Sequence, residues 1–448
     1  MKKAPMIQSV SVHKVSTPVS GALSFSGDKS LSHRAIMFGA LAEGKSSFTN
    51  VLSGEDCVCT RKAFEAMGVT IEAESPETLT VWGKGLGGLR ASATALDCGN
   101  SGTSMRLLSG ILAGQSFEST LTGDPSLSSR PMRRVTDYLK QMGAVIEGRD
   151  NANYAPLKIK GQRLSPIDAK LTVSSAQVKS AILLAGLYAK GCTSVTEPVL
   201  SRDHTENFME YFGVKIKREG LRVSVEGGQK LEARSFPIAG DVSSAAFFMA
   251  MAVLLPGASI EFKSVLNNPS RTGIFEVLKR MGVVFGNWND GKMAGPEKVV
   301  DFSLNAQKLK AFEIKKEELP SLIDEVPILM VLATQAEGVS VIHDADELRV
   351  KESDRIETMT TGLRKMGADI RVEKNTIYIN PNGKKTLLRG TEVDSFKDHR
   401  VAMSLVVAGM IAEGESGVKD THCINTSFPT FFDLLSRLGI VYKVDTIK

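Results

Sequence analysis

Residues 63–71 read AFEAMGVTI, a helix-like stretch that ends in a bulky residue and a glycine and leads into a β-rich stretch. The same pattern occurs six times along the chain, which is the signature of a repeated supersecondary unit. Glycine suits the point where each helix ends, because it adopts the left-handed conformation that other residues resist. The six glycines are Gly68, Gly143, Gly213, Gly282, Gly367 and Gly439.

An Ala-rich helix precedes each of these copies, and it too ends near a glycine and enters a strand. The repeating unit is therefore helix, strand, helix, strand, with a period longer than those of common solenoids. The first helix of each unit is apolar nearly all round, as in MFGALA at residues 37–42, so we expect it to be buried. Because one core rarely grows past ~300 residues, six units favour an α/β (α+β) fold of two domains with three units each.

The composition of the 448-residue chain excludes several classes of function. A formal net charge of +5 permits anionic ligands, but no basic run interleaved with aromatic residues indicates a nucleic-acid surface. No apolar run approaches the ~20 residues of a membrane span, and the residues after Met1 lack the apolar core of a signal peptide. The five cysteines and six histidines show no metal-ligand spacing, so we expect free thiols, a cytoplasmic protein and neither metal nor cofactor.

The residues just before the six buried helices carry most of the candidate chemistry. Gly, Ser, Asn and Asp are sound helix caps, and capping alone explains most of them. Capping does not explain four cations near these helix starts, because positive charge there opposes the helix dipole. An anion held between each cation and the free backbone N–H groups would remove this conflict, which predicts a crevice for a multiply charged small molecule. The four cations are Lys29, Arg34, Lys179 and Arg400.

Two further clusters allow both a functional and a structural interpretation. Lys351 and Arg355 are four residues apart and are expected to share a helix face, with Glu352 beside them. This arrangement suits either a ligand site or a solvated helix start. Asp324 and Glu325 precede an apolar helix, where a carboxylate is either a general base or a cap favoured by the helix dipole. Local sequence leaves these alternatives open.

Taken in order, the motifs resemble the 5-enolpyruvylshikimate-3-phosphate synthase family, and the resemblance covers nearly the whole chain. It implies two domains, each of three βαβαββ units around buried parallel helices. Residues 1–20 and 241–448 would form one domain, residues 21–240 would be inserted, and the active site would lie in the cleft between them. The motifs that carry the resemblance are GDKSLSHR at 27–34, GNSGT at 99–103, SRP at 129–131, SAQVKS at 175–180, KESDR at 351–355 and DHR at 398–400.

The resemblance implies an enzyme that transfers the enolpyruvyl group of phosphoenolpyruvate to the 5-hydroxyl of shikimate 3-phosphate and releases phosphate. The reaction would proceed through a tetrahedral adduct, without a cofactor, in the shikimate pathway of aromatic amino acid biosynthesis. Asp324 would take the hydroxyl proton, and Glu352, with Lys29, would protonate the methylene carbon. The partners implied are these two small molecules, and the protein is expected to act as a monomer.

The resemblance also assigns binding residues, and the chemistry of the substrates suits them. Phosphoenolpyruvate carries a carboxylate and a phosphate, and arginine forms bidentate pairs with both. The residues implied for shikimate 3-phosphate are Lys29, Ser30, Arg34, Ser174, Ser175, Gln177, Arg202, Asp324 and Lys351. Those implied for phosphoenolpyruvate are Lys29, Asn100, Gly102, Arg130, Gln177, Arg355 and Arg400.

Two departures from the family pattern resemble its divergent second bacterial class. Ala176 stands where many relatives have a second serine, and Thr426 stands where many have a lysine. Arg202 is the candidate donor in place of that lysine. Glyphosate also carries a carboxylate and a phosphonate, so we expect it to compete with phosphoenolpyruvate, with Gly102 setting the room in the pocket.

Two other functions remain open at this point. The sister family that acts on UDP-N-acetylglucosamine shares the fold and the donor, but it typically carries a reactive cysteine where this chain has Ser126–Arg130. A non-catalytic repeat protein that binds anions would keep the cations, but the paired acids Asp324 and Glu352 argue against it. Phosphate release with each pair of substrates would discriminate among the three functions.

Overall fold

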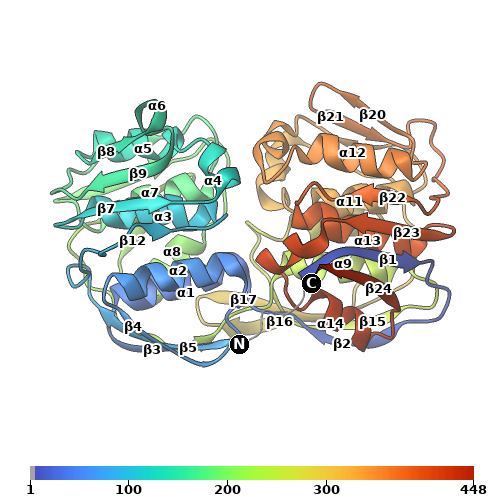
Figure 1. Ribbon diagram of the computed structural model, residues 1–448, viewed down its shortest axis with the longest axis horizontal. Helices are drawn as coiled ribbons and strands as arrows, with labels where there is room; N and C mark the ends of the chain where they lie inside the picture. The colour runs from blue at the N-terminus through green and yellow to red at the C-terminus, as the bar shows by residue number, and fades with distance from the viewer. Residues whose placement is uncertain (1–5, 448) are drawn as a thin grey trace. The chain divides into compact units, whose positions relative to one another are not determined.

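The computed structural model describes residues 6–447, and the chain divides into two compact units, each described here by itself (Figure 1). Unit 1 comprises Met1–Phe25, Gly240–Lys292 and Val299–Lys448, and unit 2 comprises Ser26–Ala239 and Met293–Lys298. The chain passes between the units after Phe25 and after Ala239, beside the boundaries that the resemblance implies. Residues 293–298, the tip of a hairpin, make a further excursion into unit 2.

Each unit contains three four-stranded sheets, and in each sheet one edge strand pairs in parallel with the strand that follows an inner helix. This arrangement confirms the predicted α/β fold of repeated βαβαββ units. The sheets of unit 2 are β14 (Phe236–Pro237), β3 (Glu43–Thr49), β5 (Thr78–Lys84), β4 (Thr70–Ser75); β6 (Leu96–Asp97), β7 (Glu118–Thr122), β9 (Tyr154–Lys160), β8 (Val145–Gly148); and β10 (Asp168–Lys170), β11 (Cys192–Thr196), β13 (Arg222–Glu226), β12 (Ile216–Glu219). Those of unit 1 are β16 (Gly286–Ala294), β17 (Glu297–Asn305), β15 (Ser259–Leu266), β2 (Ser20–Ser24); β18 (Glu313–Ile314), β19 (Ser340–Ile342), β21 (Thr376–Ile379), β20 (Ile370–Glu373); and β22 (Glu392–Asp394), β23 (Glu415–Lys419), β1 (Met6–His13), β24 (Tyr442–Ile447).

One helix of each repeat is buried along most of its length and forms the core, as its all-round apolar sequence predicts. In α9 every residue from Val242 to Val253 is buried. The inner helices are α1 (Lys29–Leu41), α3 (Gly102–Ala113) and α7 (Ala176–Gly186) in unit 2, and α9 (Val242–Leu254), α11 (Val326–Thr334) and α13 (His399–Ile411) in unit 1. The other helices are α2 (Glu55–Ala66), α4 (Pro125–Ser129), α5 (Arg133–Gln141), α6 (Arg149–Ala152), α8 (His204–Tyr211), α10 (Gly273–Arg280), α12 (Arg355–Lys365), α14 (Phe431–Arg437) and the 3-10 helices η1 (Lys316–Ser321), η2 (Asp346–Val350) and η3 (Thr421–Thr426).

The turns after the outer helices confirm the role of the repeat glycines. All six have a positive φ, from 74° at Gly439 to 97° at Gly143. A side chain at these positions would strain the backbone, which explains why glycine recurs in every copy.

The two repeats at the chain crossings exchange their first strands. β2 precedes α1 along the chain but pairs with β15 of unit 1, from Ser20 opposite Ser259 to Ser24 opposite Lys263. β14 precedes α9 but pairs with β3 of unit 2, with Phe236 opposite Phe48. Each unit therefore completes one of its sheets with a strand from a distant part of the sequence.

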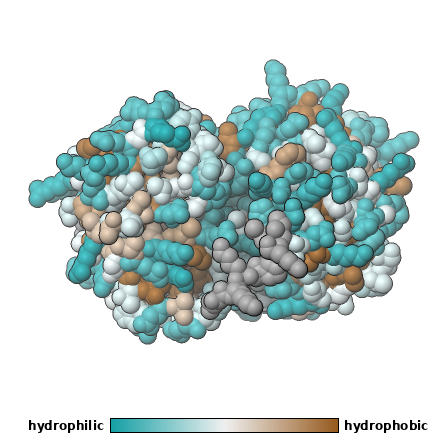
Figure 2. Space-filling model, in the orientation of Figure 1, coloured by the Kyte–Doolittle hydropathy of each residue, from teal (hydrophilic) through white to brown (hydrophobic). Residues whose placement is uncertain are grey.

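The surface gives no sign of a membrane-embedded segment. Among residues 6–447, no helix has both the length and the apolar character that crossing a membrane requires. On the face drawn in Figure 2, apolar atoms form small separate patches among hydrophilic ones. Scattered exposure of this kind is normal for a globular protein.

The packing of the inner helices makes Gly110 intolerant of a side chain. A Cβ at Gly110, in α3, would lie 2.2 Å from the carbonyl oxygen of Ala181 in α7. Backbone cannot yield as a side chain can, so Gly110→Ala should lower the free energy of unfolding by at least the ~1–3 kcal/mol typical of overpacking. A denaturation midpoint measures this loss. Gly87→Ala is the control, because a Cβ there would meet nothing within 4 Å; equal midpoints for the two variants would contradict the prediction.

Candidate active site

The first turns of the inner helices in unit 2 carry many of that unit's predicted site residues. Lys29 begins α1, and its Nζ donates to Oδ2 of Asp56 in α2 at 3.1 Å. One turn later, Nδ1 of His33 lies 2.7 Å from Oγ1 of Thr60, and burial together with Lys29 lowers the pKa of His33 to about 3. Thr60 bonds in turn to Oγ of Ser104 at 2.6 Å, so a buried chain of hydrogen bonds joins α1, α2 and α3.

Arg34 is buried beneath this surface rather than exposed on it. Its Nε donates to Oγ1 of Thr205 at 2.8 Å, and its Nη2 donates to Oγ of Ser180 at 2.9 Å. Its Nη1 donates to the carbonyl oxygen of Ser30 at 2.9 Å. Burial lowers the pKa of Arg34 to about 10, and the charge of Arg202 acts in the same direction. All three acceptors are neutral oxygens, so this region attracts an anion.

The start of α7 presents the Ser-Ala-Gln motif. Ser175 caps the helix, with its Oγ accepting from the backbone N–H of Val178 at 3.4 Å. Ser174 exchanges two hydrogen bonds with the backbone of Val199, at 2.5 and 3.1 Å, and so holds the turn that leads to Arg202. Nε2 of Gln177 donates to Oγ1 of Thr103 in α3 at 2.9 Å.

The expectation that Lys179 binds an anionic ligand is wrong. Its side chain is only 2% exposed, and its Nζ lies 2.6 Å from Glu197 and 2.8 Å from Glu206. Burial disfavours the ammonium, but the two carboxylates outweigh it and raise the pKa of Lys179. The charge near this helix start is thus neutralised inside the protein. Glu197 also accepts from the backbone N–H of Ser201 at 3.3 Å, so the ion pair braces the turn before Arg202.

Arg130 is oriented by an amide relay at the start of α3. Its Nη2 donates to Oδ1 of Asn100 at 2.6 Å, and Nδ2 of Asn100 donates to Oδ2 of Asp124 at 2.6 Å. The other oxygen of Asp124 caps α4 by accepting from the N–H of Leu127 at 2.7 Å. Gly102, the first residue of α3, has no side chain to fill the space beside these groups.

Arg106 is a residue of this region that sequence reasoning missed. It lies within α3, and its Nη1 donates to Oε1 of Gln177 at 2.5 Å. Its Nη2 donates to the carbonyl oxygen of Pro131 at 3.3 Å. The sequence signal was a cation one turn after Gly102, but attention to helix starts passed over it.

In unit 1, Arg355 gathers the predicted acids around one buried guanidinium. Its Nε donates to Asp398 at 2.9 Å, its Nη1 to Asp324 at 3.1 Å, and its Nη2 to Glu352 at 2.6 Å. Burial opposes the charge, but Asp398, Glu352 and Asp324 outweigh it and raise the pKa of Arg355. Burial would raise the pKa of Asp398, yet Arg355 holds it below its usual value.

The adjacent carboxylates Asp324 and Glu325 have different surroundings. Asp324 lies beside Arg400, whose Nε is 3.7 Å from its Oδ1. Glu325 does not cap α11; it is fully buried and accepts from Nη1 of Arg271 at 2.9 and 3.0 Å. Arg271, too distant in sequence to be paired by inspection, was also missed. Glu325 is thus neutralised internally, while Asp324 faces two arginines of the candidate site.

Lys351 and Arg355 do not share a helix face, contrary to the sequence prediction. Asp354 caps α12 by accepting from the backbone N–H groups of Ile356 and Glu357, each at 3.1 Å. Arg355 is therefore the first helical residue, and Lys351 lies in the bend before the helix. The strong capping preference of aspartate accounts for the later start.

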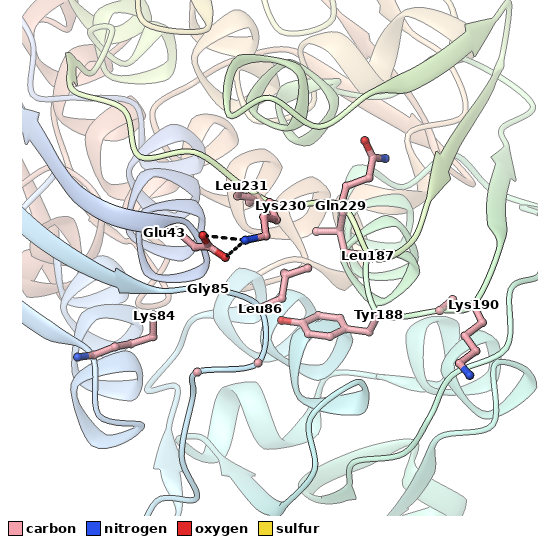
Figure 3. Close-up of a pocket in the computed structure, with 14 residues that line it drawn as sticks. Glu43, Lys84, Gly85, Leu86, Leu187, Tyr188, Lys190, Gln229, Lys230 and Leu231 are labelled. Carbon is pink, nitrogen blue, oxygen red and sulfur yellow. Dashed lines mark hydrogen bonds and ion pairs between the residues drawn. The ribbon is translucent and has the colours of Figure 1, made fainter.

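A pocket of about 620 Å³ lies at the other end of the inner helices of unit 2 (Figure 3). The turns after α1 and α7 line it, with Tyr188 on one side and an ion pair between Glu43 and Lys230 on the other. A helix of 11–13 residues spans roughly 17–20 Å, so this pocket is distinct from the helix starts that carry Lys29 and Gln177.

The polar chemistry of both clusters is that of carboxylate, ammonium and guanidinium groups. Among residues 6–447, no group of three or more His, Cys, Asp or Glu side chains is placed to hold a metal ion. The five cysteines are free, and burial raises the pKa of Cys59 to about 11 and of Cys423 to about 12. The clusters are suited to binding anions and moving protons.

A family model described as EPSP synthase (3-phosphoshikimate 1-carboxyvinyltransferase) matches residues 13–435. The 3-phosphoshikimate 1-carboxyvinyltransferase of Brevibacillus brevis is 48% identical over 421 residues, which cover 94% of this chain and 98% of the relative. That of one Bacillus cereus strain is 46% identical over 430 residues, 96% of this chain and 99% of the relative.

Solved structures give the same relationship. The EPSP synthase from Acinetobacter baumannii aligns with a TM-score of 0.88 at 44% identity, covering 98% of this chain and all of its own. The enolpyruvyl transferase NikO from Streptomyces tendae aligns with a TM-score of 0.77 at 17% identity, covering 99% of this chain and all of its own. The second likeness concerns the fold alone.

Removing the buried lysine of unit 2 should destabilise that unit. Lys179→Met leaves Glu197 and Glu206 buried without their cation, a change that typically costs ~3–5 kcal/mol. Burial then keeps the folded-state pKa of these acids above the unfolded one, so stability should recover as the pH falls and the carboxylates are protonated. Denaturation at neutral and mildly acidic pH measures this, with the exposed Lys190→Met as control. Parallel pH dependence in the two variants would count against the prediction.

Proposed function

The chain belongs to the EPSP synthase (3-phosphoshikimate 1-carboxyvinyltransferase) family, and from this we infer that it transfers the enolpyruvyl group of phosphoenolpyruvate to the 5-hydroxyl of shikimate 3-phosphate. The hydroxyl oxygen adds to C2 of phosphoenolpyruvate while C3 takes a proton and becomes a methyl group. The tetrahedral adduct then loses phosphate from C2 and a proton from the methyl carbon, which restores the double bond. The observation that carries this function is the family match over nearly the whole chain.

We assign the proton transfers to Asp324 and Glu352, with Lys29 assisting. Asp324 is the base for the 5-hydroxyl, and Glu352 is the acid for the methylene carbon. Their contact with one guanidinium, that of Arg355, supports this assignment, as does the partial exposure of their side chains, 15% and 23%. A base and an acid at one centre match the needs of an addition followed by an elimination.

Arg355 supplies a reason why ligand binding prepares these acids. Its guanidinium is 1% exposed and already holds three carboxylates. An incoming carboxylate or phosphate would replace Asp324 or Glu352 on Arg355, and the released acid would then be available for proton transfer. Arg400, beside Asp324, offers a second cation to the same anion.

The remaining assignments follow the residues carried over from the family. Shikimate 3-phosphate would be held by Lys29, Ser30, Arg34, Ser174, Ser175, Gln177, Arg202, Asp324 and Lys351, and phosphoenolpyruvate by Lys29, Asn100, Gly102, Arg130, Gln177, Arg355 and Arg400. The cap at Ser175 and the free N–H groups of the α7 start support a phosphate contact there. Thr426 donates its hydroxyl to the carbonyl of Cys423 at 2.7 Å within η3, which supports Arg202 as the further phosphate donor.

We also propose that the protein works as a monomer in the cytoplasm. Its five free cysteines suit a reducing compartment. Every residue assigned to the two substrates comes from one chain, so the reaction needs no second copy.

Release of inorganic phosphate tests the proposed function. Release that requires both phosphoenolpyruvate and shikimate 3-phosphate supports it. Release with UDP-N-acetylglucosamine in place of shikimate 3-phosphate would assign the chain to the sister reaction. Binding of the anions without release would leave an anion-binding repeat protein.

Asp324→Asn should lower kcat by about 10²–10⁴-fold, the usual contribution of general base catalysis. The amide keeps the size of the carboxylate but cannot accept the hydroxyl proton, so the KM values should change far less than kcat. Asp346→Asn, at an exposed ion pair with Lys316 in the same unit, is the matched control. An unchanged kcat in Asp324→Asn would remove this residue from the role of base.

Glyphosate should inhibit the enzyme competitively with phosphoenolpyruvate, because its carboxylate and phosphonate suit the same cations. Gly102→Ala should raise the inhibition constant more than the KM for phosphoenolpyruvate, since overpacking by one methyl group typically costs ~1–3 kcal/mol for the longer ligand. Steady-state inhibition at several donor concentrations measures both constants. Inhibition that ignores the donor concentration, or equal changes in the two constants, would contradict this prediction.

A further inference from the structure

The guanidinium of Arg106 joins three parts of unit 2 that carry candidate binding residues. It belongs to α3, which begins at Gly102, and its Nη1 reaches across to Oε1 of Gln177 in α7 at 2.5 Å. Its Nη2 reaches the carbonyl oxygen of Pro131 at 3.3 Å, directly after Arg130. None of these parts is adjacent to another in sequence, so Arg106 fixes their spacing.

The contact with Arg106 also decides which way the amide of Gln177 points. A guanidinium has only donors, so the atom of Gln177 that faces Arg106 must be the carbonyl oxygen. The amide nitrogen then lies toward α3, where it donates to Oγ1 of Thr103 at 2.9 Å. That nitrogen has a second hydrogen, whereas the oxygen is engaged by a charged donor. Gln177 is thereby set to donate to a ligand, which suits the oxygens of an anion.

We propose that Arg106 is a positioning residue for enolpyruvyl transfer. It holds Gln177 as a hydrogen-bond donor toward the substrates and steadies the segment that carries Arg130. The inference rests on the proposed function, because Gln177 and Arg130 are assigned there to the substrates. It adds a residue that neither the family motifs quoted above nor the position at a helix start would select.

The absence of a side chain at Gly102 is what leaves room for this guanidinium. A Cβ at Gly102 would lie 2.9 Å from Nη1 of Arg106, the nitrogen that donates to Gln177. It would lie 3.6 Å from Nη1 of Arg130, an ordinary contact. A methyl group there would therefore displace Arg106 first and loosen its hold on Gln177. The effect of Gly102→Ala on ligands is transmitted through Arg106.

The first test compares Arg106→Met, Arg106→Lys and Gln177→Leu in phosphate-release assays. Arg106→Met should raise the KM for both substrates by about tenfold, as expected for losing one hydrogen bond from a charged donor, with a smaller change in kcat. Arg106→Lys, which can still donate to Gln177, should recover part of the loss. In the Gln177→Leu background, Arg106→Met should add little, because the two residues act as one unit.

The matched control is Arg133→Met, which removes an exposed arginine of the same unit that pairs with Asp150. Thermal melting of each variant separates folding from positioning. If Arg106→Met melts well below the control, Arg106→Lys carries the comparison. Equal KM values for the Arg106 variants and the control, or full additivity with Gln177→Leu, would overturn the inference while leaving the proposed function intact.

A second cycle tests the link to Gly102. Gly102→Ala should impair phosphoenolpyruvate and glyphosate binding in the unmodified enzyme but should have little further effect in Arg106→Ala, where the methyl group has room. The same loss in both backgrounds would show that the methyl acts on the ligand directly and would overturn this part. An unmodified protein that releases no phosphate would overturn the proposed function and this inference with it.

Discussion

A helix buried on all sides can present polar groups only at its ends, and this constraint organises the whole protein. Six such helices form the cores of the two units, and their free backbone N–H groups must be satisfied at one end. Side chains cap five of the six starts, namely those at Asp28, Ser101, Ser175, Asp241 and Asp398. The polar residues that the caps require therefore gather at the same helix ends as the cations, and both clusters of candidate residues arise there.

The charges at these ends fall into two classes that the sequence does not separate. Lys179 and Arg271 are fully buried and are neutralised by carboxylates of their own unit. Lys29 and Arg400 are partly accessible, with side chains 19% and 8% exposed. Removing a buried partner leaves an uncompensated charge, so the first class governs stability. The second class, with Arg34 held by neutral oxygens, is available for substrate anions.

Features fixed by local sequence were predictable, and features fixed by distant pairing were not. The apolar helices, the left-handed glycines and the repeated βαβαββ unit follow from periodicity within a few residues, and the structure confirms them. The partner of Lys179 lies 18 residues away in sequence and that of Arg271 lies 54 residues away, so neither ion pair could be inferred. The shared face expected of Lys351 and Arg355 failed because the cap at Asp354 was not given its weight.

The exchange of strands between the repeats governs the order in which the protein can be built during synthesis. Unit 2 lacks an edge strand until Phe236–Pro237 leaves the ribosome, and it receives residues 293–298 later still, when Glu297 meets His204 at 2.7 Å. In unit 1, β1 lies between β23 and β24 and pairs with both. The strand made first must therefore wait, unpaired, for the strand made last. The inserted unit can approach completion while the chain is still growing, whereas unit 1 closes only after the final residues appear.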